Sequence, residues 1–400
     1  MNRNFALLVV GQSLANIGDV LYIVSVIKTI FELTGSAASS SMVPFTITTA
    51  MFISSLLTPL LMEKLSLKWM MAGSQIGKTL LLIIMGLMFT HLTETNYYLI
   101  FFFIGLIALL DGCANPVMKA LVPFYVEPEH LLKANAVTET VLQMIQALMW
   151  FVGSLLLIVL HPQQIIWLAC SLFVLSSFLV CLLENVRCRS HAPKGKWAQI
   201  MEGWQVLFRT PVLKRIAWID FFETIATTVW ISAILLVFVN EALHADEKWW
   251  GFINGAFFFG MIAGSVFCWR YSAFVERRLA AFILAGSFAG FIVTLLFGLV
   301  HDPFIALLLS FSVGIFSQIK GIPQQTVIQS SVYKEQLPKV YSSLGAIGTG
   351  IFGVGSLLMG ILADLSGVRG IFVLSGLLLG LITVIVYRNK QLFAVNVVEK

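Results

Sequence analysis

Long apolar runs, separated by short polar segments, repeat along the whole chain. Each run has about 20 residues or more, enough for a helix to cross the hydrocarbon core of a bilayer. The pattern predicts an all-α membrane protein with twelve transmembrane helices, at residues 5–31, 41–62, 69–90, 97–121, 134–160, 164–184, 213–241, 249–269, 279–300, 303–326, 338–363 and 369–388. No small-residue cleavage site of the A-x-A type is evident with the first run, so we expect a first span there and not a removed signal peptide.

Composition supports a membrane protein over a soluble one. Of the 400 residues, 58% are hydrophobic and only 11% are charged, whereas soluble proteins have about 25% charged residues. The five cysteines form no C-x-x-C pair. We therefore expect reduced packing cysteines, no metal and no cofactor.

The basic residues lie almost entirely on one side of the predicted spans. Nineteen of the 25 lysines and arginines lie on the side of the N-terminus, two on the opposite side and four within spans. Cytoplasmic loops are enriched in Lys and Arg, so we expect cytoplasmic N- and C-termini. The same distribution explains the net charge of +5 without a nucleic-acid partner.

One long connection divides the spans into two sets of six. Residues 185–212 are basic and contain Trp197 and Trp204, which favours an amphipathic helix on the membrane surface. We therefore predict a six-helix bundle at 1–184, a cytoplasmic linker at 185–212 and a second six-helix bundle at 213–400. A weak repeat, "EHLLKANA" (Glu129–Ala136) and "EQLPKVYS" (Glu335–Ser342), supports two related halves.

Two stretches carry a more specific resemblance. "GQSLANIGDVLYIV" (Gly11–Val24) and "GIPQQTVIQSSVYKEQLPKVYSSLGAI" (Gly321–Ile347) resemble the drug and siderophore exporters of the major facilitator superfamily, the branch that includes macrolide efflux proteins and the enterobactin exporter. The resemblance implies the major facilitator fold, with spans 1, 4, 7 and 10 lining a central cavity.

The superfamily's loop between spans two and three reads G-x-L-A-D-R-x-G-R-[RK], and this chain has "PLLMEKLSLK" (Pro59–Lys68) there. The resemblance makes Glu63, Lys64 and Lys68 candidates for a cytoplasmic gate, although Pro59 departs from the pattern. A better match, "GILADLSGVR" (Gly360–Arg369), falls on the predicted outer side, so we do not assign it that role.

Ionisable residues within spans are costly and mark functional sites or structural ion pairs. Gln12, Asn16 and Asp19 share one helix face, while Asp220 and Glu223 stand one turn apart. Two such close carboxylates do not both ionise easily in a low dielectric. The candidates for proton coupling are Asp19, Glu223, Asp220 and Asp111. A structural ion pair remains the alternative for Asp19, and Lys78 is expected to partner a neighbouring polar group.

Other polar or aromatic residues of the same spans are candidates for lining the substrate cavity: Gln12, Asn16, Asn115, Thr227, Trp230, Lys320 and Gln324. Asp111 is followed by Gly112 and Pro116, and Lys320 by Gly321 and Pro323, where a helix can bend.

No phosphate-binding G-x-x-x-x-G-K-[ST] motif and no catalytic constellation is present in the sequence. We therefore expect a secondary active transporter and not an enzyme: a proton-coupled antiporter that exports a hydrophobic or amphipathic small molecule by alternating access, as in multidrug resistance. The expected partners are that molecule, protons and the lipid bilayer, and the expected form is a monomer in a bacterial cell membrane. The alternatives are an importer or lipid translocator on the same fold, and a transport-dead membrane sensor or assembly partner.

Overall fold

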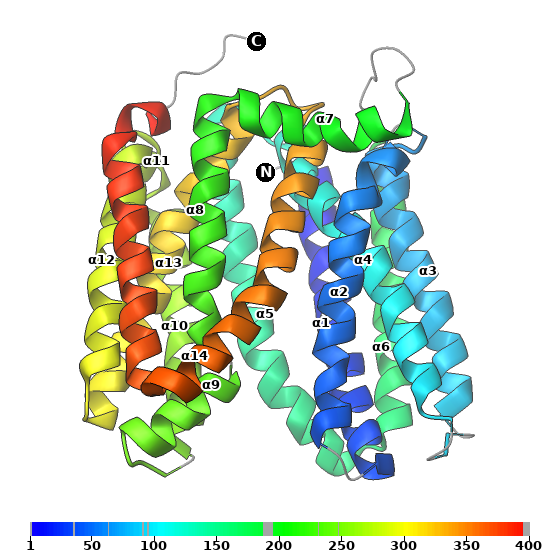
Figure 1. Cartoon of the computed structure of the whole chain (residues 1–400). Coiled ribbons are helices and arrows are strands. Elements are labelled where there is room, and N and C mark those ends of the chain that lie inside the picture. The colour runs from blue at the N-terminus through cyan, green and yellow to red at the C-terminus, as the bar shows by residue number, and fades with distance from the viewer. Residues whose placement is uncertain are drawn as a thin grey trace. The chain divides into compact units, whose positions relative to one another are not determined.

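A computed structural model describes residues 2–34, 37–62, 64–89, 92–93, 96–186, 195–230, 232–246 and 248–394 (Figure 1). Within these ranges the regular elements are all helices. The first half of the chain forms α1 (Arg3–Thr34), α2 (Ala37–Met62), α3 (Leu67–Met88), α4 (Tyr98–Tyr125), η2 (Pro128–His130), α5 (Leu131–Val159) and α6 (Pro162–Cys181). The second half forms α7 (Lys196–Arg209), α8 (Pro211–Thr227), η3 (Thr228–Trp230), α9 (Ser232–Val237), η4 (Phe238–Ala242), α10 (Lys248–Arg270), α11 (Ser272–Glu276), α12 (Leu279–Leu299), α13 (Pro303–Ser330), α14 (Leu337–Arg388) and η5 (Lys390–Phe393).

Every predicted span overlaps helical residues. In the described part of the chain, nine helices are long and apolar enough to cross a membrane, or ten if the bent segment from α8 to η4 is one span. The all-helical membrane fold is therefore confirmed, while the count of twelve spans and the cytoplasmic termini stay predictions.

The last two predicted spans lie in one continuous element, α14, which has a break at Gly367. Its 52 residues would measure about 78 Å as one straight helix, far more than a bilayer core of about 30 Å. Gly367 has φ 76° and ψ 157°, a conformation that suits glycine. Arg369 secures the break, because its guanidinium donates to the carbonyl oxygens of Gly298 (3.1 Å), Val300 (2.7 Å) and Ala242 (2.7 Å).

The predicted seventh span is bent by 50° between α8 and α9. Just before the bend, the hydroxyl of Thr227 donates to the Glu223 carbonyl at 2.9 Å and that of Thr228 to the Ile225 carbonyl at 2.6 Å. Such back-bonding by threonine often bends helices, which accounts for a bend where the sequence has no proline.

The described residues group into two compact units. The first comprises Met1–Glu127, Ile145–Val206 and Lys334–Thr349, and the second comprises Pro128–Met144, Leu207–Tyr333 and Gly350–Lys400. Helices α5 and α14 therefore each contribute to both units. The predicted bundles 1–184 and 213–400, joined by 185–212, stay a prediction.

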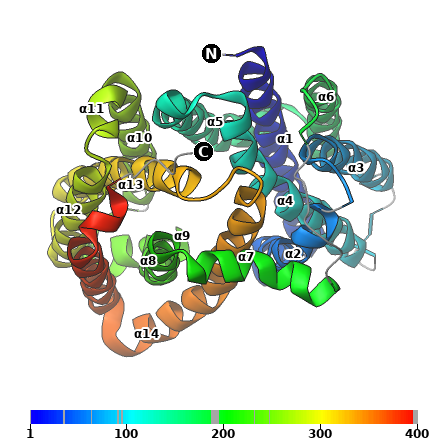
Figure 2. The same ribbon diagram turned by 90° about the horizontal axis from the view of Figure 1, so that it is seen from above.

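In the first unit, α1 packs against α6, α2 against α4, and α3 against both α4 and α6 (Figure 2). Helix α7 lies where the linker predicts an amphipathic helix: Trp197 is exposed, whereas Gly203 and Leu207 are buried. A salt bridge of 2.9 Å joins Glu202 of α7 to Lys339 at the start of α14. The placement of α7 on the membrane surface stays a prediction.

In the second unit, α13 packs against both α10 and α12 (Figure 2). The close α10–α13 contact requires glycine at two positions. A Cβ at Gly260 would overlap the backbone oxygen of Phe311, and a Cβ at Gly314 would overlap the backbone oxygen of Phe257. Small residues let membrane helices approach closely, so these glycines set the distance between the two helices.

We expect Gly260→Ala to lower the free energy of unfolding by about 1–3 kcal/mol, because the added methyl group must push α13 away. The matched control is Gly255→Ala on the same helix, where a Cβ meets no atom within 4 Å. The control should be neutral or slightly stabilising, since alanine favours helix over glycine. Denaturant titration of both purified variants is the measurement, and equal stabilities would contradict this account of the α10–α13 contact.

Candidate functional site

Three in-span charges meet inside the first unit. The Lys78 ammonium of α3 donates to an Asp19 carboxylate oxygen of α1 at 2.8 Å and to an Asp111 carboxylate oxygen of α4 at 2.5 Å. The Lys78 side chain is fully buried, while those of Asp19 and Asp111 remain 21% and 18% exposed. We refer to Asp19, Lys78 and Asp111 as the ion triad.

Apolar neighbours fix the position of the Lys78 ammonium. It lies 4.4 Å from the centroid of the Phe173 ring, a distance at which a cation is attracted to a ring face. Phe173 reaches this position because residue 18 is glycine, where a Cβ would lie 2.7 Å from the ring. Tyr22, one turn beyond Asp19 on α1, is also buried.

The polar face predicted on α1 is present. The Gln12 side chain donates to the Asn16 side chain at 3.2 Å, and Asn16 is followed one turn later by Asp19. Gln12 is buried and Asn16 half-buried. Asn115, one turn after Asp111 on α4, is half-buried as well.

A second set of charges lies in the second unit, between α8 and α13. The Lys320 ammonium contacts a Glu223 carboxylate oxygen at 2.5 Å, and the Gln324 amide donates to Asp220 at 2.7 Å. Lys320 is nearly buried, with 5% of its side chain exposed, against 29% for Glu223. The lower residue numbers on α8 pair with the higher ones on α13, so the two helices run antiparallel here.

Two further cavity candidates occupy different surroundings. Thr227 is exposed, and its hydroxyl donates a hydrogen bond to the Glu223 carbonyl oxygen. Trp230 packs in an aromatic cluster, with ring centroids 4.6 Å from Phe297 and 5.4 Å from Phe372. The role of both in binding a substrate stays a prediction.

A buried amide cluster that sequence reasoning missed joins α5 to α13. The Asn135 amide donates to Thr326 at 3.1 Å and to Gln329 at 2.7 Å, and the Gln329 amide donates back to Asn135 at 3.2 Å. The polar run from Gln324 to Gln329 was visible in the sequence. Nothing local identified Asn135, 191 residues from Thr326, as its partner.

The predicted gate residues are only partly described. Glu63 lies outside the described residues. Lys64 is exposed in the turn after α2, and the Lys68 ammonium lies 5.5 Å from the centroid of the Trp69 ring. Ser66 caps α3 by accepting a hydrogen bond of 3.4 Å from the backbone N–H of Trp69, so this loop forms a defined helix start.

The family assignment rests on matches over most of the chain. The family model described as Major Facilitator Superfamily matches residues 8–239 and 221–393. The chain belongs to the major facilitator superfamily. Its members are transporters and not enzymes, so this chain is a membrane transporter.

Sequence relatives within the superfamily are bacterial. The chain is 30% identical to the Bacillus subtilis (strain 168) protein named "Uncharacterized MFS-type transporter YfmI", over 95% of this chain and 94% of the relative. It is 24% identical to the "Multidrug efflux pump Tap" of Mycolicibacterium fortuitum, over 65% of this chain and 64% of that one.

Solved structures of the superfamily share the fold at low sequence identity. An outward-facing structure of the transporter FucP superimposes with a TM-score of 0.79 at 16% identity, covering 96% of this chain and 98% of that one. The human organic anion transporter MFSD10 superimposes with a TM-score of 0.78 at 13% identity, covering 96% and 99%. These likenesses concern the fold alone.

We expect Lys78→Met to lower the free energy of unfolding by about 3–5 kcal/mol, because it leaves two neighbouring carboxylates without their cation. The triple variant Asp19→Asn/Lys78→Met/Asp111→Asn should recover most of that loss. The control is Lys28→Met, which removes a lysine from a more exposed pair with Glu32 and should cost at most about 1 kcal/mol. Denaturant titration gives the three values, and a loss in Lys78→Met no greater than in the control would contradict a stabilising triad.

Proposed function

We propose that this protein is a proton-coupled exporter of a hydrophobic or amphipathic small molecule that works by alternating access. The single observation that carries the proposal is the charge imbalance of the ion triad. Two carboxylates and one ammonium carry a net formal charge of −1 when all are ionised. A net charge is unfavourable in a poorly solvated site, so binding a proton or a cationic group there is favoured.

Partial exposure supports exchange at this site. Asp19 and Asp111 each keep about a fifth of their side chain accessible, whereas Lys78 has none. A proton can therefore reach the carboxylates, while the ammonium stays in place as their common partner. In the second unit, Lys320 pairs with Glu223, and the neighbouring Asp220 accepts a hydrogen bond from the amide of Gln324. We favour the first unit as the site of proton binding, because both of its carboxylates contact the same ammonium.

A sequence relative bears on the nature of the cargo. The relative named multidrug efflux pump Tap favours efflux of drug-like molecules. A specific variant of the proposal is that a cationic cargo and a proton compete for the same excess carboxylate. The triad favours this variant because it already accommodates one cation between two acids.

The test is proton-driven transport into proteoliposomes, with ethidium as a hydrophobic cation and chloramphenicol as a neutral molecule. We expect Asp19→Asn and Asp111→Asn each to lower uphill transport at least about tenfold, because an amide cannot exchange a proton at physiological pH. Asp364→Asn, a change of an exposed carboxylate on α14, is the matched control. Ethidium binding should fall only if the cation binds the carboxylate directly.

Wild-type-like uphill transport in Asp19→Asn, in Glu223→Gln and in the double variant would mean that these carboxylates are structural. Transport with no linked proton movement would remove the coupling proposal. Accumulation of ethidium in cells that express the protein, in place of depletion, would indicate an importer.

Alternating access requires contacts that break and re-form, and the amide cluster is a suitable one. It joins α5, from the first predicted bundle, to α13, from the second. Its side chains satisfy one another, so opening exposes amides that water can also hydrogen-bond. Such an exchange has a small net cost, as a reversible contact requires. The predicted gate at Glu63, Lys64 and Lys68 is a second candidate for such a contact, and Glu63→Gln should shift the conformational balance while leaving cargo binding intact.

We expect Asn135→Ala to favour the open form of the α5–α13 contact by about tenfold, since it leaves Gln329 and Thr326 without their shared partner. Hydrogen–deuterium exchange of residues 131–140 and 322–330 should then be faster. Thr138→Ala is the matched control, because the buried Thr138 hydroxyl has no hydrogen-bond partner among the described residues. Unchanged exchange in Asn135→Ala would contradict this role.

A further inference from the structure

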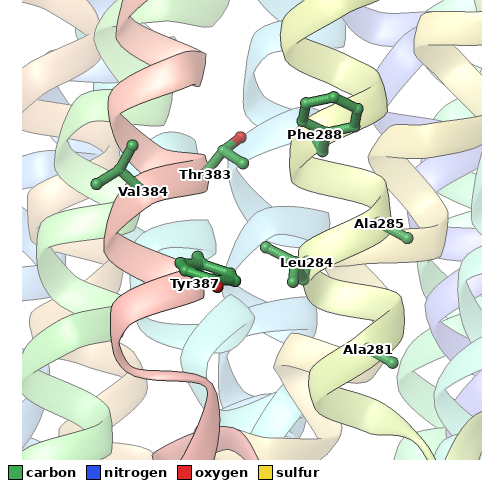
Figure 3. A pocket seen from close by; sticks show the side chains of 7 residues that line it. All are labelled: Ala281, Leu284, Ala285, Phe288, Thr383, Val384 and Tyr387. Carbon is green, nitrogen blue, oxygen red and sulfur yellow. The ribbon is translucent and has the colours of Figure 1, made fainter.

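An apolar groove of about 470 Å³ lies between α12 and the end of α14 (Figure 3). Figure 3 shows Leu284 and Phe288 of α12 on one side and Val384 and Tyr387 of α14 on the other. Ala281 and Ala285, one turn apart on α12, supply only methyl groups to the lining. The lining from residue 281 to 288 extends about 10 Å along the α12 axis.

The groove follows directly on a region where two antiparallel helices are in close contact. Nearer the break in α14 they are in close contact: a Cβ at Gly376 would lie 3.0 Å from Leu295, and one at Gly380 would lie 3.1 Å from Phe291. In the next two turns of α14, the side of the helix that carries Gly376 and Gly380 carries Val384 and Tyr387 instead. No further glycine follows in α14, so larger side chains line the groove on this side.

The chemistry of the lining favours an alkyl chain over a polar ligand. The only polar side chains are Thr383, whose hydroxyl donates to the Leu379 carbonyl at 3.0 Å, and the Tyr387 phenol. Phe288 and Tyr387 are 54% and 60% exposed, so the groove is open along the outer surface of the helices. Among the residues that the structure describes, no charged side chain lines the groove, and the Tyr387 phenol is the one lining group whose hydroxyl has no hydrogen bond within its own helix.

Basic groups surround one end of this groove. Arg277 and Arg278 directly precede α12, while Arg388 ends α14 and Lys390 begins η5, which contacts α12. The Lys390 ammonium lies 5.4 Å from the centroid of the groove-lining Tyr387 ring. All four basic side chains are exposed, and among the described residues no carboxylate forms a salt bridge with them. Glu276 is the one acidic residue beside them in the sequence.

We propose that this groove binds an anionic phospholipid, with one acyl chain along α12 and α14 and the headgroup phosphate at Arg277, Arg278, Arg388 and Lys390. Apolar contact alone does not select a lipid, because any lipid tail is equally apolar. Selection comes from the basic cluster, since Lys and Arg near the membrane surface attract anionic headgroups. The proposal is independent of the transported cargo and of the direction of transport.

The test uses purified protein and two lipids with identical acyl chains, phosphatidylglycerol and phosphatidylcholine. Thermal-shift titration should show about tenfold tighter binding of phosphatidylglycerol. A phosphatidylglycerol with a photoreactive group on its acyl chain should label peptides that contain residues 281–288 or 383–387. Equal binding of the two lipids, or labelling confined to other helices, would overturn the proposal.

Two variants separate the headgroup from the acyl chain. Arg278→Gln/Arg388→Gln/Lys390→Gln should remove the preference for phosphatidylglycerol, whereas Arg209→Gln/Lys214→Gln/Arg215→Gln, an equal loss of exposed charge elsewhere in the chain, should retain it. Ala285→Trp fills the groove at unchanged net charge and should abolish acyl-chain labelling. The proposal would be overturned if the first variant kept its preference for phosphatidylglycerol or if the control variant lost it. It would also be overturned if Ala285→Trp were labelled as strongly as the wild type, or if ethidium or chloramphenicol displaced the lipid.

Discussion

The Lys78 ammonium is fully buried in a protein whose surroundings are largely apolar, and such a charge is tolerated only when the protein supplies counter-charges and hydrogen-bond acceptors. Asp19 and Asp111 supply both, at 2.8 and 2.5 Å. This requirement joins α1, α3 and α4, because each provides one member of the triad. The residues around the ammonium fit the same requirement. Because residue 18 is glycine, the Phe173 ring can pack beside α1 and cover the Lys78 ammonium.

The second unit meets the same requirement with different chemistry. Lys320 pairs with one carboxylate, that of Glu223, and the neighbouring Asp220 accepts a hydrogen bond from the neutral amide of Gln324. The Lys320 ammonium therefore has a salt bridge to Glu223 in this set, whereas the Lys78 ammonium contacts two carboxylates in the ion triad.

Small residues and helix breaks determine how closely the elements approach and where they part. Gly260 and Gly314 bring α10 and α13 together, and Gly376 and Gly380 do the same for α12 and α14. Beyond the last of these glycines, larger side chains of α14 line the groove with α12. Gly367 allows the chain to turn back, and Arg369 satisfies helix-end carbonyls that would otherwise lack donors at that turn.

The sequence by itself determined the helical class, the approximate position of each helix and the in-span residues that merit attention. These depend on local properties: an apolar run of sufficient length must be a helix in a membrane, and an ionisable residue within it is conspicuous. It also indicated the shared face of Gln12 and Asn16, which follows from helix periodicity alone.

Tertiary structure decided which charges meet. Lys78 pairs with residues 59 and 33 positions away, and Asn135 with one 194 positions away. Such pairs depend on the rotation and height of each helix against its neighbours, which are set by packing between distant side chains and leave no local signal in the sequence.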